Sequence, residues 1–471
     1  MYMGVLFGLL SLLVIACIAS VSGALSFSPL SIIGGAATFV AVSVIANYAL
    51  GYIFSIKTQI QSAVITGLIL SFIFTPPTEV KDYLVIAIVG SIAMASKYLL
   101  AWRGRHIFNP AAIAAVIISL AGITAASWWV ATPALFVPVL VFGTFTLYRT
   151  HRLVMGYIYI FIALIVSILV TFFNGPLSTE TLWVIVASYP ILFLAFFMLS
   201  EPLTQAPRHW QRISIAVGIA AVASSQLFIF NTLITPEIAL VVGNLVAFMY
   251  SQKRGIKLRY VSKREYENNQ VAYYFKPEHP LSFTAGQYLE LSLAHTSTDL
   301  RGMRRMFSIA SSENDELIRV ITRHSSPSSS FKSALSTLKE NDTIPVTGIY
   351  GDFVLPTKTS DKLVFLAGGI GITPFLSHIA SLSGSRDITL LYFIRDQADI
   401  IDMKELTKAK DLGIRTYFVQ DQSIVEAFDE HVPDSAQSTV YISGSPGFVD
   451  KAKIITKNRA KKVVTDYFSG Y

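Results

Sequence analysis

The hydrophobic and polar positions divide the chain into two unlike halves that meet near Tyr250. Before that point, long uncharged apolar runs are separated by short polar loops, and after it charged residues are spread as in a soluble protein. Most of the runs approach the roughly 20 residues with which a helix crosses a bilayer. We therefore predict a polytopic α-helical membrane domain over 1–250, with about ten spans at 3–22, 30–55, 59–75, 82–100, 109–127, 133–149, 153–173, 180–199, 212–230 and 235–250.

After Tyr250 the pattern changes twice. Short segments that alternate apolar and polar residues fill 251–357, as in an antiparallel β-barrel. From 358 to 471, apolar strands alternate with helical segments, which predicts an α/β, Rossmann-like domain. Its clearest element is L-V-F-L-A-G-G-I-G-I-T-P at Leu363–Pro374, a strand that runs through a glycine turn into a helix. Such a helix start offers N–H groups to a pyrophosphate.

Basic residues fall in alternate loops of the first half, which orients the predicted helices. Lys81 is the only basic residue in one set of loops, whereas the other set carries Lys57, Lys97, Arg103, Arg105, Arg149, Arg152, Arg208 and Arg212. Cytoplasmic loops are enriched in Lys and Arg, so we predict that the second set of loops is cytoplasmic. Both termini and the soluble half are then also cytoplasmic, in a multi-pass protein of the plasma or inner membrane. No basic segment precedes the first run, so we predict a span there and not a cleaved signal peptide.

Proline-containing motifs recur in the first half. The segments F-T-P-P-T and S-E-P-L-T end the third and eighth predicted spans, and F-N-P-A-A and I-T-P-E-I follow them. Pro77 and Pro110 are 33 residues apart, and Pro202 and Pro236 are 34 apart. A repeat offset by five spans would be inverted in the membrane, so the pattern predicts a five-plus-five inverted repeat.

Composition excludes several classes of protein. The chain is 53% hydrophobic with only 14% charged residues, so its net charge of +7 is assigned to cytoplasmic loops and not to nucleic-acid binding. The single cysteine, Cys17, excludes an internal disulfide and a Cys-ligated iron–sulfur cluster. The histidines of the first half, His106, His151 and His209, lie in predicted loops, so we expect no transmembrane haem and no metal site.

The segment R-R-M-F-S-I-A-S-S at Arg304–Ser312 has the chemistry of a flavin contact. Arg305 and Phe307 share one face of an extended segment. A guanidinium pairs well with phosphate, an aromatic ring can stack on isoalloxazine, and the Ser308 hydroxyl can bond near flavin N5. The serine-rich start of a helix at 325–335 could hold a second phosphate group.

The second half resembles the ferredoxin–NADP⁺ reductase family over about 256–471, in R-M-F-S, S-x-F-K-x-x-L, G-x-Y-G-D-F, L-A-G-G-I-G-I-T-P, S-G-S-P-G-F and the F-S-G-Y end. This resemblance implies an FAD barrel followed by an NAD(P) domain. It implies FAD contacts from Tyr288, Arg305, Met306, Phe307, Ser308, Thr322, Ser329, Ser330 and Phe331, with Tyr471 as a candidate that stacks on the flavin or merely packs. The implied NAD(P) contacts are Gly368, Gly369, Gly371, Thr373, Pro374, Arg395, Gly444, Pro446 and Phe448. Many members have Cys where this chain has Ser443, and Asp396 beside Arg395 leaves NADH or NADPH open.

The first half resembles the membrane subunit shared by Na⁺-translocating NADH:quinone reductases and Rnf complexes, through G-R-H-I-F-N-P-A-A and L-S-E-P-L-T-Q-A-P. The resemblance implies a second flavin, FMN or riboflavin, in the membrane. The family's S-G-A-T-like attachment motif is absent, so we expect non-covalent binding. Candidate contacts are Arg103, Arg105, Asn109, Glu201, Thr204 and Arg208, although the arginines also serve as topology signals and Asn109 as a helix cap. Asn244 either lines a path or bonds a neighbouring helix.

These patterns together predict a membrane flavoprotein that takes hydride from cytosolic NAD(P)H to FAD. Single electrons would then enter the membrane half toward a quinone or an extracytoplasmic redox protein. A haem-bearing ferric reductase or NADPH oxidase is the disfavoured alternative. A redox-regulated transporter and an electron-driven ion pump stay open, although we expect almost no buried carboxylates in the spans.

Overall fold

The computed structural model describes residues 2–54, 58–102, 105–150, 152–229, 232–250, 256–293, 295, 299, 303–324, 327–358 and 361–467, without the side chains of Tyr2, Arg105 and Tyr467. The chain divides into two compact units, Met1–Arg254 and Gly255–Tyr471. We call them unit 1 and unit 2 and describe each by itself.

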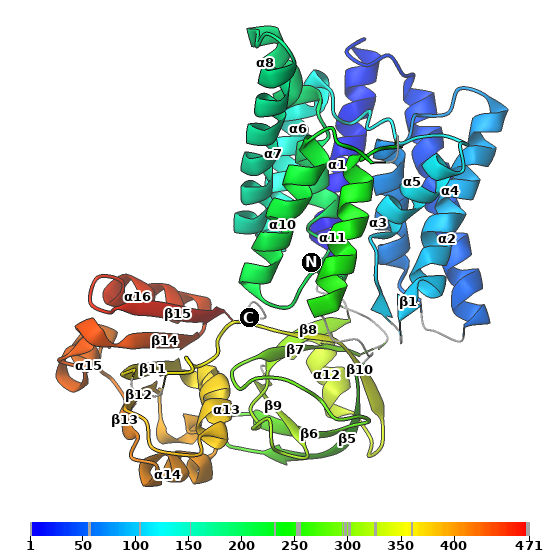
Figure 1. The fold of residues 1–471 in the computed structure, drawn as a ribbon. Helices are drawn as coiled ribbons and strands as arrows, with labels where there is room; N and C mark the ends of the chain where they lie inside the picture. The colour runs from blue at the N-terminus through cyan, green and yellow to red at the C-terminus, as the bar shows by residue number, and fades with distance from the viewer. Residues whose placement is uncertain are drawn as a thin grey trace. The chain divides into compact units, whose positions relative to one another are not determined.

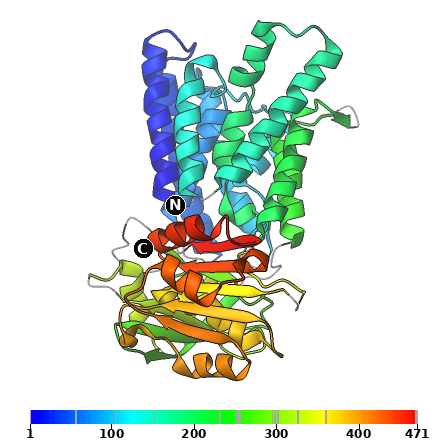
Figure 2. The same ribbon diagram turned by 90° about the vertical axis from the view of Figure 1, so that its left-hand side faces the viewer.

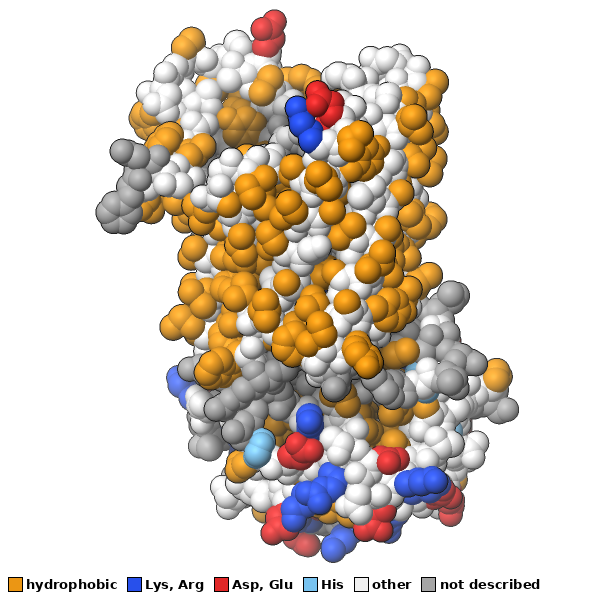
Figure 3. Space-filling model, turned by 90° about the vertical axis from the view of Figure 1, so that its right-hand side faces the viewer, with side chains coloured by type: hydrophobic (Ala, Val, Ile, Leu, Met, Phe, Trp, Pro, Cys, Tyr) orange, Lys and Arg blue, Asp and Glu red, His pale blue; other side chains and the backbone are white. Residues whose placement is uncertain are grey.

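Over its described residues, unit 1 is helical apart from two short hairpins, and its helices run side by side (Figures 1 and 2). Its elements are α1 Tyr2–Val21, α2 Pro29–Ile53, α3 Ile60–Ile73, α4 Val80–Leu99, β1 Ala101–Trp102, β2 Arg105–His106, α5 Pro110–Leu120, α6 Pro133–Arg149, α7 Leu153–Asn174, α8 Thr179–Ser188, α9 Ile191–Phe193, η1 Leu194–Met198, η2 Pro202–Thr204, α10 His209–Ser224, β3 Phe228–Ile229, β4 Thr232–Leu233 and α11 Pro236–Tyr250. The visible face of unit 1 carries a broad band of hydrophobic side chains with few charges (Figure 3).

Each predicted span contains a helix, but the structure does not show ten membrane spans. Among the described residues, five helical segments are long and apolar enough to cross a membrane, and they are α1, α2, α4, α7 and the stretch Thr179–Met198 that comprises α8, α9 and η1. Helices α3, α5, α6 and α11 have 10–17 residues. The short helix α3 ends where Pro76 and Pro77 prevent its continuation. The loop after α5 then caps it, because the Ile73 carbonyl accepts the Ser127 and Trp128 amides at 2.8 and 3.0 Å.

The packing of unit 1 supports the five-plus-five repeat. Helix α2 packs on α3 and α4, and α7 packs in the same way on η1 and α10. Hairpin β1–β2 lies between α4 and α5 in the chain, and hairpin β3–β4 lies between α10 and α11. The two halves meet through α1 with α6 and through α5 with α11. The five-plus-five repeat itself stays a prediction.

Close packing at Gly143 gives a first testable prediction. A Cβ atom on Gly143 would lie 1.9 Å from Cδ2 and 2.3 Å from Cγ of the buried Phe196 ring. Because the clash involves the base of a buried ring, Gly143→Ala should lower the free energy of unfolding by roughly 1–3 kcal/mol. Thermal unfolding in detergent should show a lower midpoint for this variant.

Gly218→Ala provides the matched control, because nothing lies within 4 Å of a Cβ at that helical position. It should be neutral or slightly stabilising, since alanine favours the helix over glycine. Equal midpoints for the two alanine variants would contradict this packing.

Unit 2 begins with an antiparallel barrel. Within the described residues, its sheet has six strands in the order β8-β7-β10-β5-β6-β9, and a bridge between Ile309 and Val320 joins the edge strands. The core contains Leu258, Phe275 and Leu289, all fully buried. The elements are β5 Ile256–Glu265, β6 Gln270–Pro277, β7 Tyr288–Ser292, β8 Arg304–Ser308, β9 Ile318–Arg323, α12 Ser330–Ser336 and β10 Thr343–Tyr350.

A parallel sheet completes unit 2, with five strands in the order β13-β12-β11-β14-β15 among the described residues. One face is covered by α13 and α14 through residues such as Phe375 and Leu406, and the other by α15 and α16 through Phe428 and Val449. The elements are β11 Leu363–Gly368, η3 Gly369–Ile372, α13 Thr373–Ser381, β12 Ile388–Phe393, η4 Gln397–Asp399, α14 Met403–Asp411, β13 Arg415–Val419, α15 Ile424–His431, η5 Ser435–Gln437, β14 Thr439–Gly444, α16 Pro446–Thr456 and β15 Lys462–Tyr467. The strand order reverses between β11 and β14, where doubly wound sheets bind ligands at the carboxyl ends of the strands.

Candidate functional site

Two glycine turns meet at the reversal point of the parallel sheet. A Cβ on Gly371 would lie 2.3 Å from the Ser443 carbonyl oxygen, so the first turn rests directly on the backbone of the second. A Cβ on Gly368 or on Gly444 would lie 2.8 Å from the Phe448 ring. The predicted NAD(P) glycines are therefore brought together, and Phe448 packs across both turns.

The first turn leaves an open cradle before α13. Gly369 has a φ of +54°, and nothing lies within 4 Å of a Cβ built on it. Thr373 is 1% exposed, and its hydroxyl donates to the Ile370 carbonyl at 3.1 Å. Pro374 is buried in the first turn of the helix. Thr373 and Pro374 thus shape the helix start, and their side chains do not face a nucleotide as the sequence suggested; backbone N–H groups remain for the phosphates.

Three polar side chains converge beside these turns. Ser308, at the end of β8, donates to the Asp466 carboxylate on β15 at 3.4 Å. Asp466 stands opposite Ser443 of β14 in the sheet register. The Ser443 hydroxyl is fully buried and has no hydrogen-bond partner among the described residues. A buried hydroxyl of this kind is expected to have a ligand or water as its partner.

Sequence analysis missed Asp466. Burial raises its pKa to about 7, and the hydrogen bond from Ser308 opposes that rise. The available signal was a single acid in the last strand, K-K-V-V-T-D-Y, whose register places it beside Ser443. Register between distant strands cannot be read from the local pattern.

The barrel face that carries Ser308 also carries Tyr288 and Met306. Tyr288 pairs directly with Ser308, and Met306 is 38% exposed. Phe307 points to the opposite side, where it is 8% exposed and its ring centroid lies 5.8 Å from that of Phe331 in the barrel core. The expected stacking role of Phe307 is therefore corrected, because its ring packs inward. Tyr288 lies on the outer face, where it pairs with Tyr350 of β10.

Arg305 shares the inward side with Phe307, as predicted from their spacing, and lies beside α12. Its guanidinium donates to both Asp299 carboxylate oxygens at 2.8 and 2.9 Å and lies 5.4 Å from the centroid of the Phe331 ring. A phosphate at Arg305 would share the guanidinium with Asp299.

The remaining FAD candidates have structural roles near α12. The Ser329 hydroxyl caps this helix by accepting the Lys332 amide at 3.3 Å. The Ser330 hydroxyl accepts the Asp299 amide at 3.0 Å. Phe331 is fully buried and Thr322 is 5% exposed, so neither side chain is presented to a ligand in the way that the sequence suggested.

Arg395 follows β12 at the same carboxyl edge as the glycine turns. It is exposed and lines a cavity of about 340 Å³ with Asn268, Asn269, Arg323, His324, Asp396 and Asp399. The Asp396 carboxylate caps η4 by accepting the Asp399 amide at 3.1 Å and also accepts Asn268 Nδ2 at 3.1 Å. Pro446 is exposed at the start of α16. Tyr471 lies outside the described residues.

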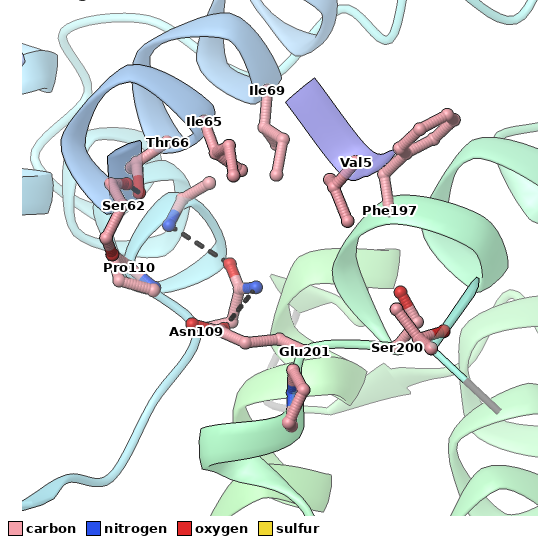
Figure 4. Close-up of a pocket in the computed structure, with 13 residues that line it drawn as sticks. Val5, Ser62, Ile65, Thr66, Ile69, Asn109, Pro110, Phe197, Ser200 and Glu201 are labelled. Atoms are coloured by element: carbon pink, nitrogen blue, oxygen red, sulfur yellow. Dashed lines mark hydrogen bonds between the residues drawn. The ribbon is translucent and has the colours of Figure 1, made fainter. Parts of the chain in front are cut away.

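Only some of the residues predicted to contact a membrane flavin lie next to one another in unit 1 (Figure 4). Asn109 Nδ2 donates to Glu201 Oε2 at 2.8 Å, and Asn109 Oδ1 accepts the Ala111 and Ala112 amides, so the capping role of Asn109 is confirmed. Asn244 Oδ1 accepts the Asn109 amide at 2.8 Å, which favours its helix-bonding role. Thr204 is buried, Arg208 is exposed at the start of α10, and Arg103 and the Arg105 side chain lie outside the description.

The cavity at Asn109 and Glu201 does not fit a flavin. It encloses about 60 Å³ and is lined by Val5, Ser62, Ile65, Thr66, Ile69, Asn109, Pro110, Ala111, Thr150, Phe197, Ser200, Glu201 and Pro202. Organic ligands usually occupy pockets of roughly 300–1,000 Å³, whereas this space suits a few water molecules. A membrane flavin at these residues is therefore not supported.

No protein-family model matches the chain. The flavohemoprotein of Bacillus subtilis (strain 168) is 25% identical over 212 residues, which cover 40% of this chain and 52% of that protein. The reductase component of propane 2-monooxygenase from Mycolicibacterium smegmatis is 27% identical, with 39% and 58% covered. NADH-cytochrome b5 reductase 1 of Aspergillus terreus is 26% identical, with 42% and 75% covered. Among solved structures, the Amycolatopsis cytochrome P450 reductase GcoB aligns with a TM-score of 0.41 at 23% identity, over 46% of this chain and 70% of that one.

The sequence relatives link the C-terminal region to ferredoxin–NADP⁺ reductase-like modules of NAD(P)H-dependent, FAD-containing oxidoreductases, which confirms the predicted enzyme class. The chain spans about half the length of the first two relatives. The resemblance of the first half to membrane electron-transport subunits stays a prediction.

Proposed function

We propose that the protein is a membrane-bound flavoprotein that oxidises cytosolic NAD(P)H through FAD and passes single electrons into the membrane. The observation that carries this proposal is the convergence of Ser308 from the barrel with Asp466 and Ser443 from the parallel sheet, beside two glycine turns. Such a junction can hold a flavin and a nicotinamide against each other.

The residues present fit both cofactors. The open cradle at Gly369 and the start of α13 suit a pyrophosphate, and the unpartnered Ser443 hydroxyl suits a polar group of nicotinamide. On the barrel, Tyr288 and Ser308 line one face. On the other side, Arg305 would share its guanidinium between a phosphate and Asp299. Bound FAD would supply the chemistry that accepts a hydride and releases electrons singly. The chain's own residues position the two cofactors and set the charge around them.

The membrane part of the proposal rests on unit 1. Its five long apolar helices and its hydrophobic surface support a location in the cell membrane, and the basic loops support a cytoplasmic unit 2. We propose a quinone or an extracytoplasmic redox protein as the electron acceptor. Since the cavity at Glu201 does not accommodate a flavin, any second flavin would have to lie elsewhere in unit 1.

The first test is flavin stoichiometry with an anaerobic NAD(P)H titration of purified full-length protein, followed by absorbance. One or more flavins bleached by NADH or NADPH, without a haem band, is the expected result. A second bleached flavin would support a relay within the membrane, and a single FAD would favour direct delivery to the acceptor. A protein that binds no flavin after reconstitution with FAD would refute the proposal.

A redox-driven ion pump is the second candidate. Glu237, at the start of α11, is 2% exposed and accepts Trp128 Nε1 at 3.3 Å. The sequence had suggested almost no buried carboxylates in the spans, so this finding favours the alternative, as buried acids in membranes usually serve function. Voltage generation in proteoliposomes during NAD(P)H oxidation, lost in Glu237→Gln, would support it.

The titration of Asp466 gives a further prediction. Because burial raises its pKa to about 7, its negative charge appears as the pH rises through neutrality. A carboxylate beside the reacting groups opposes the arrival of a hydride, so stopped-flow flavin reduction should slow several-fold between about pH 6 and 8. Asp466→Asn, which stays neutral, should lose this dependence while retaining FAD. A pH profile unchanged by the substitution would contradict this role.

A further inference from the structure

Helix α16 and the segment that follows it present an unusually basic surface to solvent. The thirteen residues 450–462 contain six Lys or Arg and one acid, Asp450, whereas the whole chain has 37 Lys and Arg in 471 residues. All six basic side chains are exposed, and they are Lys451, Lys453, Lys457, Arg459, Lys461 and Lys462. Only Arg459 forms an ion pair among the described residues, with Asp429. The five lysines therefore direct their charge to solvent.

An apolar side chain stands in the middle of this charge. Val449, Ala452 and Thr456 bury the inner side of α16, and the helical period then points Ile454 directly outward. Ile454 is 77% exposed, among the highest values of any large hydrophobic residue in unit 2. Lys451 and Lys457 lie three residues before and after it, and the exposed Asp450 lies one helical turn before it. We call Ile454, Lys451, Lys453 and Lys457 the basic face of α16.

The arrangement of the basic face matches an anionic lipid surface. Interfacial helices combine Lys on their polar flanks with an apolar residue that enters the headgroup region. The cytoplasmic leaflet carries a negative surface potential that attracts clustered Lys and Arg. Only five residues separate α11 from β5, a span of roughly 20 Å even when extended, so a bilayer around unit 1 lies within reach of unit 2.

We propose that the basic face of α16 binds the anionic headgroups of the bilayer that holds unit 1. This inference rests on the proposed membrane location. Because α16 begins at the second glycine turn, docking would fix the reductase module near the membrane through an element of its nucleotide-binding domain.

The test uses full-length protein with Cys17→Ser as background and Ile454→Cys labelled with acrylodan. The protein is reconstituted into vesicles of phosphatidylcholine alone or with phosphatidylglycerol. We expect a blue shift of the emission only with phosphatidylglycerol, reversed in about 1 M NaCl, where the screening length falls to about 3 Å. Adding Lys451→Gln, Lys453→Gln and Lys457→Gln should lower the ratio of docked to undocked protein on the order of a hundredfold.

The charge-matched control is Lys404→Gln, Lys408→Gln and Lys410→Gln on α14, where all three lysines are exposed; the shift at position 454 should persist in it. Co-flotation with the vesicles in a density gradient shows whether the protein is membrane-bound. If the protein co-floats but its emission shows no lipid-dependent shift, this proposal alone is overturned. If the protein does not co-float, the membrane location is overturned and this proposal with it. A shift seen in native membranes but not in pure lipid vesicles also overturns it and assigns the face to a protein partner.

Discussion

Gly371→Ala should lower the rate of flavin reduction by NAD(P)H on the order of a hundredfold while FAD stays bound. The added Cβ would lie 2.3 Å from the Ser443 carbonyl oxygen and 2.6 Å from the Gly444 Cα, both backbone atoms. No rotamer change can relieve such a clash, so the two glycine turns must move apart by several tenths of an ångström or more. A displacement of about 1 Å at a reacting centre commonly costs a hundredfold in rate. Stopped-flow absorbance under anaerobic conditions measures the effect.

Gly384→Ala is the matched control for this experiment. Gly384 lies in an exposed loop of the same domain, and nothing lies within 4 Å of a Cβ built on it. Its rate should equal that of the wild type. If Gly371→Ala reduces its flavin at the same rate as Gly384→Ala, the glycine turns do not position the nicotinamide, and the proposed site is wrong.

Acid should destabilise unit 2 through His378 by a large amount. This histidine is 1% exposed, and its ring lies among the rings of Phe353, Phe365 and Tyr441. Burial lowers its pKa to about 3, partly offset by the backbone of Phe353. The unfolded chain binds a proton near pH 6.5 while the folded chain does not, so stability is lost as the pH falls from 6.5 toward 3. The full loss is about 5 kcal/mol, with roughly 3 kcal/mol of it reached by pH 4.

His378→Leu should remove this loss. A leucine of similar volume suits the apolar surroundings, so stability near pH 7 should change little and the acid midpoint should move to lower pH. The acid midpoint is followed through the fluorescence of released FAD, which reports the unfolding of unit 2. Tryptophan fluorescence would report unit 1 instead, because all five tryptophans lie there. His279→Leu is the control, since His279 is exposed and its removal should leave the acid midpoint unchanged. Identical acid midpoints for His378→Leu and the wild type would show that His378 is not the group responsible.

Local patterns in the sequence predicted a large part of the architecture. Apolar runs located a helix in each expected span, because long uncharged apolar runs are typical of helices that can cross a bilayer. The strand at Leu363–Gly368 and the glycine turn after it were readable for the same reason, since a buried parallel strand is apolar on both faces. The spacing of Arg305 and Phe307 correctly placed both on one side of β8.

The sequence by itself thus determined the two halves, the order of their elements and the location of the glycine turns, because these depend on the periodicity and composition of neighbouring residues. Only the tertiary structure decided which side of β8 faces the core, where the helices of unit 1 stop, and which polar groups meet. Ser308 and Asp466 are 158 residues apart, and Asn109 and Glu201 are 92 apart. Contacts over such separations are set by strand register and helix packing, since a period fixes the face of a side chain but not the partner opposite it.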